Sequence, residues 1–255
     1  MKRFILLLFI LNTMFGCSQS YGPGYQFSLF KKTVNWELAQ AVERENVAQI
    51  EAILKNDAVV KMNLQDSVYG QTLLNLAVGN DKPVSTKLLL EHGANYAISD
   101  NFGFAPIHTA TTLIGSRKYS AEIIKILLIH GADPNAIAII NKNNPSKYVP
   151  LMDAVKNIEC AKLLIEYGAN IYYKDSLDYP IWASMLVQDT KNSESIFVAK
   201  YLIVDKKKVV PDPVFYTIPN NIPRSASFLI KEFDTNGDIQ KQKAKDEILK
   251  ALNAK

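Results

Sequence analysis

One short phrase occurs three times in this chain, and the repetition constrains its possible folds more than any other feature. The copies read LLEHGAN from Leu89, LLIHGAD from Leu127 and LIEYGAN from Leu164. The apolar pair suits a buried helix face, the glycine can adopt the left-handed conformation that ends a helix, and the Asn or Asp favours a turn. Three such units in succession predict a repeat architecture.

A second motif stands ahead of each of these glycines. In two of its three copies a proline leads into the apolar run. Proline is tolerated in the first turn of a helix, because an N–H there would have no intrahelical partner. Each unit therefore reads as a short helix, a tight turn, a second helix and an extended loop. The copies are TLLNLA at Thr72–Ala77, APIHTA at Ala105–Ala110 and VPLMDA at Val149–Ala154.

The two motifs resemble those of the ankyrin repeat, which begins with T-P-L-H-x-A and ends with G-A-D-x-N over about 33 residues. The unit that joins Ala105–Ala110 to Gly131–Asn135 is the closest copy. Asp100 and Gly103 fit the D-x-x-G hairpin tip of the family. The resemblance implies an all-α solenoid of about five to six helix-turn-helix repeats, covering roughly residues 35–235.

Weaker copies flank the central units, as expected for terminal repeats that have a neighbour on one face only. A final amphipathic helix is predicted at Asp238–Asn253, so residues 35–255 form one repeat domain with a C-terminal cap. Polar insertions at 115–120, 140–147 and 188–195 are expected to protrude as loops. The weaker copies are Trp36–Ala41 with Ile53–Leu54, Tyr179–Ser184 with Leu202–Ile203, and Pro213–Ile218 with Phe228–Phe233.

The N-terminus has the layout of a cleaved secretory signal. Two basic residues, the unbroken apolar run Phe4–Leu11 and a small residue, Gly16, follow one another. The apolar run is too short to span a membrane, which needs about 20 residues. We predict that residues 1–16 form a signal peptide that is removed.

The end of this signal, MFGC, resembles a bacterial lipobox whose cysteine is Cys17. In lipoproteins of that kind, diacylglycerol is attached to the cysteine. The resemblance implies lipidation of Cys17, and Ser18 in place of an aspartate implies an outer-membrane anchor that faces the periplasm. Cys160 is then a buried free thiol. Without lipidation, plain secretion and a Cys17–Cys160 disulfide are the alternatives.

Residues 17–34 connect the predicted lipid to the first helix. The Gly, Pro and Ser content of Ser18–Lys32 favours a flexible tether. Aromatic residues in the same segment could instead pack on the first repeat, and both alternatives stay open. These residues are Tyr21, Tyr25, Phe27 and Phe30.

Charge and motif content argue against nucleic-acid binding, metal binding and catalysis. Removing Lys2 and Arg3 from the 29 basic residues leaves 27 against 25 acidic ones, which is too balanced for a nucleic-acid-binding domain. The histidines occupy repeat positions on successive units and do not converge on a metal. DTNGD at 234–238 lacks the glutamate that a calcium loop needs at position twelve. We expect no enzyme activity, cofactor, metal or small-molecule substrate. The histidines are His92, His108 and His130.

Aromatic residues near the loop that opens each repeat form the predicted partner-binding surface. Such loops line up along one edge of a solenoid, and aromatic side chains dominate interface hot spots. Each ring could instead fold back onto its own repeat. The five residues are Tyr69, Phe102, Phe104, Tyr148 and Tyr179.

These features together predict a periplasm-facing lipoprotein that binds a protein through its ankyrin concave face. This architecture and address resemble those of ankyrin-repeat immunity proteins of type VI secretion lipase effectors. The resemblance implies that the partner is a membrane-attacking, phospholipase-type secreted toxin. A general envelope scaffold or stress-protective ankyrin protein is the alternative.

Overall fold

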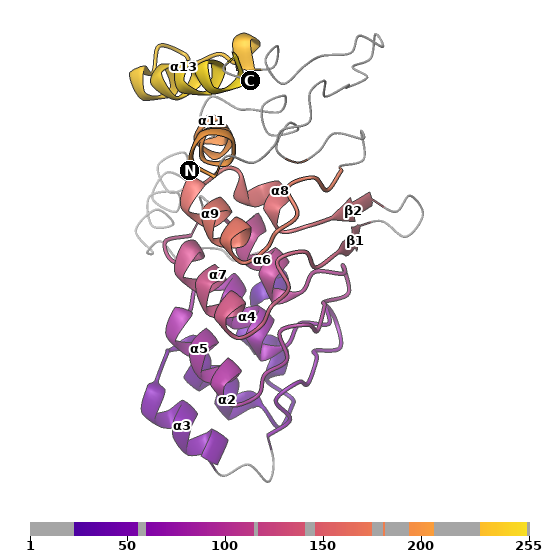
Figure 1. Ribbon diagram of the computed structural model, residues 1–255. Coiled ribbons are helices and arrows are strands. Elements are labelled where there is room, and N and C mark those ends of the chain that lie inside the picture. The colour runs from indigo at the N-terminus through magenta and orange to yellow at the C-terminus, as the bar shows by residue number, and fades with distance from the viewer. Residues whose placement is uncertain are drawn as a thin grey trace, which may run out of the picture.

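The computed structural model describes residues 23–55, 60–114, 117–140, 146–174, 181, 194–206 and 230–253. The predicted signal peptide, Cys17, Tyr179 and residues 213–229 lie outside this set. Figure 1 shows helix pairs stacked from the indigo N-terminal part towards the yellow C-terminal helix. The predicted all-α repeat fold is confirmed.

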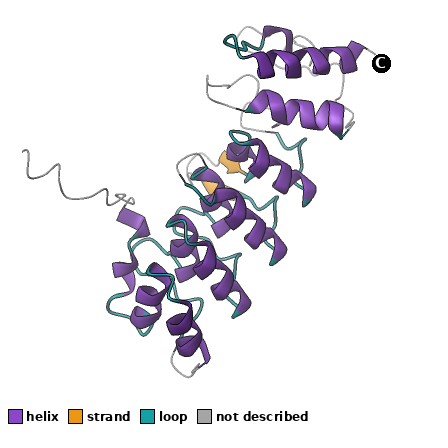
Figure 2. Ribbon diagram, turned by 90° about the vertical axis from the view of Figure 1, so that its left-hand side faces the viewer, coloured by secondary structure: helices purple, strands orange, loops and turns teal. Residues whose placement is uncertain are grey.

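Helix pairs form two rows that run the length of the stack. First helices contact first helices, and second helices contact second helices. Figure 2 shows the same stacking after a turn of 90°. We call α2, α4, α6 and α8 the first-helix row, and α3, α5, α7, α9 and α11 the second-helix row. The elements are α2 (Trp36–Glu43), α3 (Val47–Lys55), α4 (Leu73–Gly79), α5 (Pro83–Glu91), α6 (Pro106–Thr112), α7 (Ser120–Ile129), α8 (Leu151–Ala154), α9 (Ile158–Glu166) and α11 (Ser195–Lys200), the last continued by the π-helical turn η3 (Tyr201–Asp205).

The repeat glycines end second helices as predicted. Gly93, Gly131 and Gly168 have φ angles of 88°, 95° and 94°, in the left-handed region where a Cβ would clash with the backbone. The amide that follows each glycine donates to a carbonyl five residues earlier, at 2.9–3.0 Å. This closure satisfies a carbonyl that the end of the helix leaves without a partner.

Carboxylates in the tight turns connect one repeat to the next. The backbone of Glu45 is left-handed, and its Oε1 accepts from the Val84 N–H at the start of α5 (3.0 Å). Asp81 repeats this arrangement one unit later and accepts from the Lys118 and Tyr119 N–H groups ahead of α7, at 3.0 and 3.1 Å. An anion at a helix N-terminus satisfies unpaired N–H groups and complements the helix dipole. Neighbouring second helices are therefore held in register by polar caps as well as by packing.

A continuous apolar core runs between the two rows. Both helices of each unit contribute leucine, isoleucine or alanine side chains, so each repeat buries its neighbour's apolar face. The largest fully buried side chains include Leu73, Leu76, Leu89, Ile107, Ile123 and Ile124.

The C-terminal helix α13 (Ile239–Asn253) closes the stack by packing on α11 and η3. Ala244 and Ile248 are buried, as the predicted amphipathic pattern requires. Asp238 Oδ1 accepts from the N–H groups of Gln240 and Lys241 at 2.8 and 3.0 Å. The DTNGD stretch is therefore a turn that caps a helix.

Two short strands flank the insertion predicted at 140–147, of which residues 141–145 lie outside the described set. β1 (Ala138–Ile140) and β2 (Ser146–Tyr148) pair antiparallel, with Ala138 opposite Tyr148. Residues 138–140 are two β-branched isoleucines preceded by alanine, a composition that favours an extended chain. The sequence did not predict these two strands.

The segment Pro23–Phe30, which we call the N-terminal strap, packs against the stack. It consists of two short 3₁₀ turns, η1 (Pro23–Tyr25) and η2 (Phe27–Phe30). Phe27 and Phe30 are buried in the core beside α2. Of the two alternatives left open by the sequence, packing holds for this part, and the predicted tether can extend no further than residue 22. In the part of the chain that the structure describes, no helix has the length and apolar character needed to cross a membrane.

Candidate partner-binding surface

The loops that open the second and third repeats are held rigid by buried aspartates. Asp100 Oδ1 accepts from the N–H groups of Phe102 and Phe104, both at 2.9 Å. Asp66 Oδ1 accepts from Val68 and Tyr69 in the same way, both at 2.8 Å. Each predicted aromatic residue on these loops is therefore presented by a backbone that its own repeat fixes in place.

Adjacent loop tips are also joined to one another. Asn101 donates its N–H to the Tyr69 carbonyl (2.9 Å) and its Nδ2 to the Val68 carbonyl (3.0 Å). Gln71 Nε2 donates to Asp100 Oδ2 at 3.0 Å. Burial raises the pKa of Asp100, although the hydrogen bonds that its carboxylate accepts from Phe104, Phe102 and Gln71 oppose the rise. A preformed edge of this kind loses little conformational freedom when it binds a partner.

The two predicted aromatic residues nearest the tips differ in accessibility. Phe102 is 59% exposed at the tip between Asp100 and Gly103. Tyr69 is half-buried, and its ring lies against Gly24 of the strap, where an added Cβ would stand 3.6 Å from it. Phe102 therefore presents the larger free apolar face to a partner.

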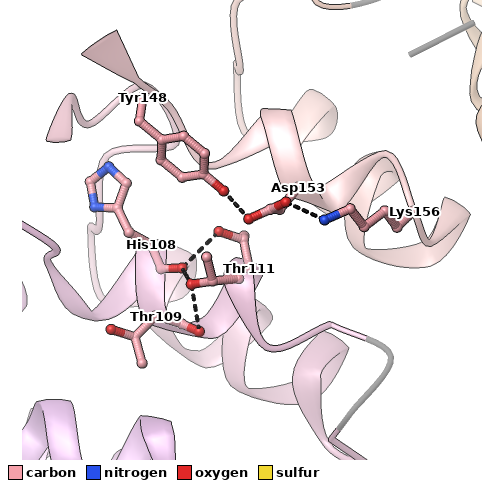
Figure 3. Close-up of polar contacts among 7 residues, drawn as sticks. His108, Thr109, Thr111, Tyr148, Asp153 and Lys156 are labelled. Atoms are coloured by element: carbon pink, nitrogen blue, oxygen red, sulfur yellow. Dashed lines mark hydrogen bonds and ion pairs between the residues drawn. The ribbon is translucent and has the colours of Figure 1, made fainter. Parts of the chain in front are cut away.

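Phe104 and Tyr148 form an aromatic cluster with His108. The ring centroid of Phe104 lies 5.9 Å from that of His108 and 5.7 Å from that of Tyr148, and both ring pairs are edge-on. Figure 3 shows the Tyr148 hydroxyl donating to Asp153 of α8, which also pairs with Lys156. These two rings fold back onto their own repeats in part, and remain half-buried.

His108 stabilises the loop that follows its repeat. Its Nδ1 accepts from the Ala105 N–H (3.2 Å), which leaves Nε2 to donate to the Ala136 carbonyl (2.9 Å). Burial is the main cause that lowers the pKa of His108. His92 and His130 instead contact carbonyls of their own helices, those of Leu88 and Ile126. Of the three histidines, His108 is therefore the one whose ring bonds the backbone of the loop that follows its repeat.

The other titratable and thiol groups in the described ranges add no metal site to this surface. No group of three or more His, Cys, Asp or Glu side chains there is placed to hold a metal ion. Cys160 is a buried free thiol, and burial raises its pKa to about 12.

Sequence reasoning missed the part that the strap plays on this surface. The strap reaches the first-helix row at Tyr25, and Asn80 Nδ2 donates to the Tyr25 carbonyl at 2.8 Å. Gly79, the last residue of α4, has no side chain and leaves room there for the Tyr25 ring.

Comparisons with known proteins agree with this geometry. Ankyrin repeats match residues 38–138 as three copies and residues 147–176 as one further repeat. An ankyrin repeat protein of fowlpox virus is 30% identical over 165 residues, covering 63% of this chain and 47% of that protein. An intracellular phospholipase A2 of Caenorhabditis elegans is 32% identical over 113 residues, covering 43% of this chain and 9% of that enzyme. The chain thus spans less than half the length of these curated relatives.

A solved structure supports the fold. The crystal structure of an ankyrin repeat protein aligns with a TM-score of 0.57 at 21% identity, covering 86% of this chain and 97% of that one. The ankyrin matches together cover just over half of the 255 residues. With the repeat motifs, the two helix rows and the loop tips in agreement, the chain belongs to the ankyrin repeat family.

Proposed function

We propose that this protein is a periplasm-facing outer-membrane lipoprotein that neutralises a membrane-attacking, phospholipase-type secreted toxin by binding it. Ankyrin repeats are protein-binding modules, so the repeats themselves imply a protein partner. The signal-like N-terminus and Cys17 support the proposed location at the outer membrane, facing the periplasm. The main support for a binding role is the exposed ring of Phe102, which lies on a loop tip that hydrogen bonds to Asp100 hold in place.

The partner surface lies on the part of the concave face that the strap leaves open. The strap contacts Tyr69, the end of α4 and, through Tyr25, Thr109 of α6, whereas the Phe102 ring stays exposed and Phe104 pairs with Tyr148 of the next repeat. An exposed aromatic flanked by half-buried rings suits a hot spot at which a partner inserts an apolar residue. A lipid anchor would raise the local concentration of such an inhibitor at the membrane under attack.

The similarity to a phospholipase A2 is not a reason to propose lipase activity for this chain. The match covers only 9% of that enzyme. We propose binding as the whole function. The second candidate is a general envelope scaffold or stress-protective ankyrin protein. In that case the same surface would bind an envelope protein in place of a toxin.

Site-specific photocrosslinking tests this proposal in the native envelope. A photoreactive residue replaces Phe102 in one variant and exposed Lys87 of α5 in a matched control. Capture of a phospholipase-type toxin at position 102 alone, together with loss of protection in a Phe102→Ala strain exposed to that toxin, is the expected result. Housekeeping envelope proteins captured at position 102, with full protection retained, would favour the scaffold instead.

A further inference from the structure

The strap is seated on the first-helix row by a glycine. The last residues of α2, α4 and α6 are Glu43, Gly79 and Thr112, so only α4 of these three ends without a side chain. A Cβ built on Gly79 would lie 2.2 Å from Cδ1 and 2.4 Å from Cε1 of Tyr25. Glycine destabilises a helix relative to alanine, and the seat for the Tyr25 ring is a packing reason for it here.

Polar and aromatic contacts hold the same part of the strap. Asn80 is buried and divides its Nδ2 group between the carbonyls of Tyr25 (2.8 Å) and Leu76 (2.7 Å). Gly24 lies against the Tyr69 ring. Together with the buried rings of Phe27 and Phe30, these contacts fix the strap from its first residues to α2.

The place where the strap begins limits where a lipid on Cys17 can lie. Cys17 is six residues before Pro23. An extended chain spans at most about 3.3–3.6 Å per residue, so the lipidated residue lies within about 20 Å of the start of the strap. The strap contacts Tyr69 on the second repeat's loop and Asn80 at the end of α4, so the chain enters the fold on the side of the first-helix row.

We propose that the strap fixes the orientation of the anchored protein, with the first-helix row and the Asp66–Gly70 tip turned towards the membrane and the second-helix row turned away. The inference rests on the proposed lipid anchor. It also defines the kind of partner: a protein that reaches the concave face of this solenoid has to lie at the membrane surface or move along it.

Energy transfer to a bilayer tests the orientation. Lipidated full-length protein carries one fluorophore, either at Ser67→Cys on the tip or at Lys87→Cys on α5; both positions are exposed and belong to the same repeat. Vesicles of phosphatidylethanolamine and phosphatidylglycerol contain a headgroup-linked acceptor. Cys160 is buried and is not expected to take the label. Transfer is expected to be severalfold more efficient from position 67 than from position 87.

Two control variants separate the strap from the lipid. Gly79→Ala places a Cβ inside the Tyr25 ring and should release the front of the strap, so the difference between the two labels should shrink. A 20-residue Gly-Ser insertion after Ser20 should have the same effect without changing any contact in the described fold.

The outcomes distinguish the orientation from the anchor. Protein that does not attach to the vesicles overturns the lipid anchor, and the orientation with it. Protein that attaches but transfers equally from positions 67 and 87 overturns the orientation alone. A difference that persists unchanged in both control variants also overturns it, because the strap would then not be its cause.

Discussion

The ring of Tyr25 occupies the space that a side chain on Gly79 would need. The residues are 54 positions apart in the sequence, and the contact joins the segment before the first repeat to the end of the second repeat's first helix. The same contact places the strap beside Tyr69 and leaves Phe102 free. The missing side chain at Gly79 therefore leaves the space that the Tyr25 ring occupies at the end of α4.

Replacing Gly79 with alanine should detach the front of the strap while the repeats stay folded. Alanine favours a helix over glycine by about 1 kcal/mol, which offsets part of the lost Tyr25 packing, so the thermal midpoint should change little. Amides from Gly24 to Gln26 should lose protection in hydrogen exchange. Glu43→Ala changes the same position of α2 and serves as the matched control; equal protection in both variants would show that the strap does not need the glycine seat.

Replacing Gly131 with valine should destabilise the centre of the solenoid by roughly 1–3 kcal/mol, because a β-branched residue is strained at a positive φ. Gly131 has φ 95°, and an added Cβ would also lie 3.0 Å from the Tyr96 hydroxyl. Gly93→Val has the same strain with open space around the Cβ. Chemical denaturation should rank Gly131→Val as the less stable of the two, and unchanged unfolding in both would contradict the left-handed helix ends.

Acid should destabilise the fold through His108. Burial lowers the pKa of His108 in the folded state, whereas the unfolded side chain titrates near about 6.5. Between these two values the unfolded chain binds the extra proton, so stability is complete above about pH 6.5 and falls as the pH drops towards the folded pKa. Denaturant titrations from pH 7.5 down to 5.5 should show this slope.

A His108→Gln variant is the control for that slope, since it has no proton to gain in this range. The raised pKa of Asp100 acts in the opposite direction, because the folded state then binds a proton more readily than the unfolded chain. A wild-type profile as flat as that of the variant would mean that His108 is not held neutral by the fold.

Replacing Cys17 with serine should release the protein from membranes, because it removes the thiol to which the proposed diacylglycerol anchor is attached. Fractionation of cells that express the full chain, followed by extraction with salt and with detergent, measures this. The wild type should require detergent, and the serine variant should appear in the soluble envelope fraction. A variant that still requires detergent would rule out the lipid anchor at this residue.

The repeat phrases alone were sufficient to predict the fold, because each residue in them has a local reason. Gly93, Gly131 and Gly168 need a left-handed backbone, and the apolar pairs before them need a buried face. The C-terminal helix followed from its own apolar spacing. The paired strands 138–140 and 146–148 were not predicted from the sequence. Each strand has three residues, which is too short to show the alternation of apolar and polar side chains that marks a strand.

The sequence by itself therefore determined the ankyrin repeat and its helix ends, which depend on neighbours a few residues apart or one repeat away. Only the tertiary structure decided which aromatic rings are free. Phe102 is exposed, the Phe104 and Tyr148 rings pack on His108, and Tyr25 covers Gly79. The physical reason is that the exposure of a ring depends on contacts with side chains that are distant in the sequence. A local sequence pattern does not predict such contacts.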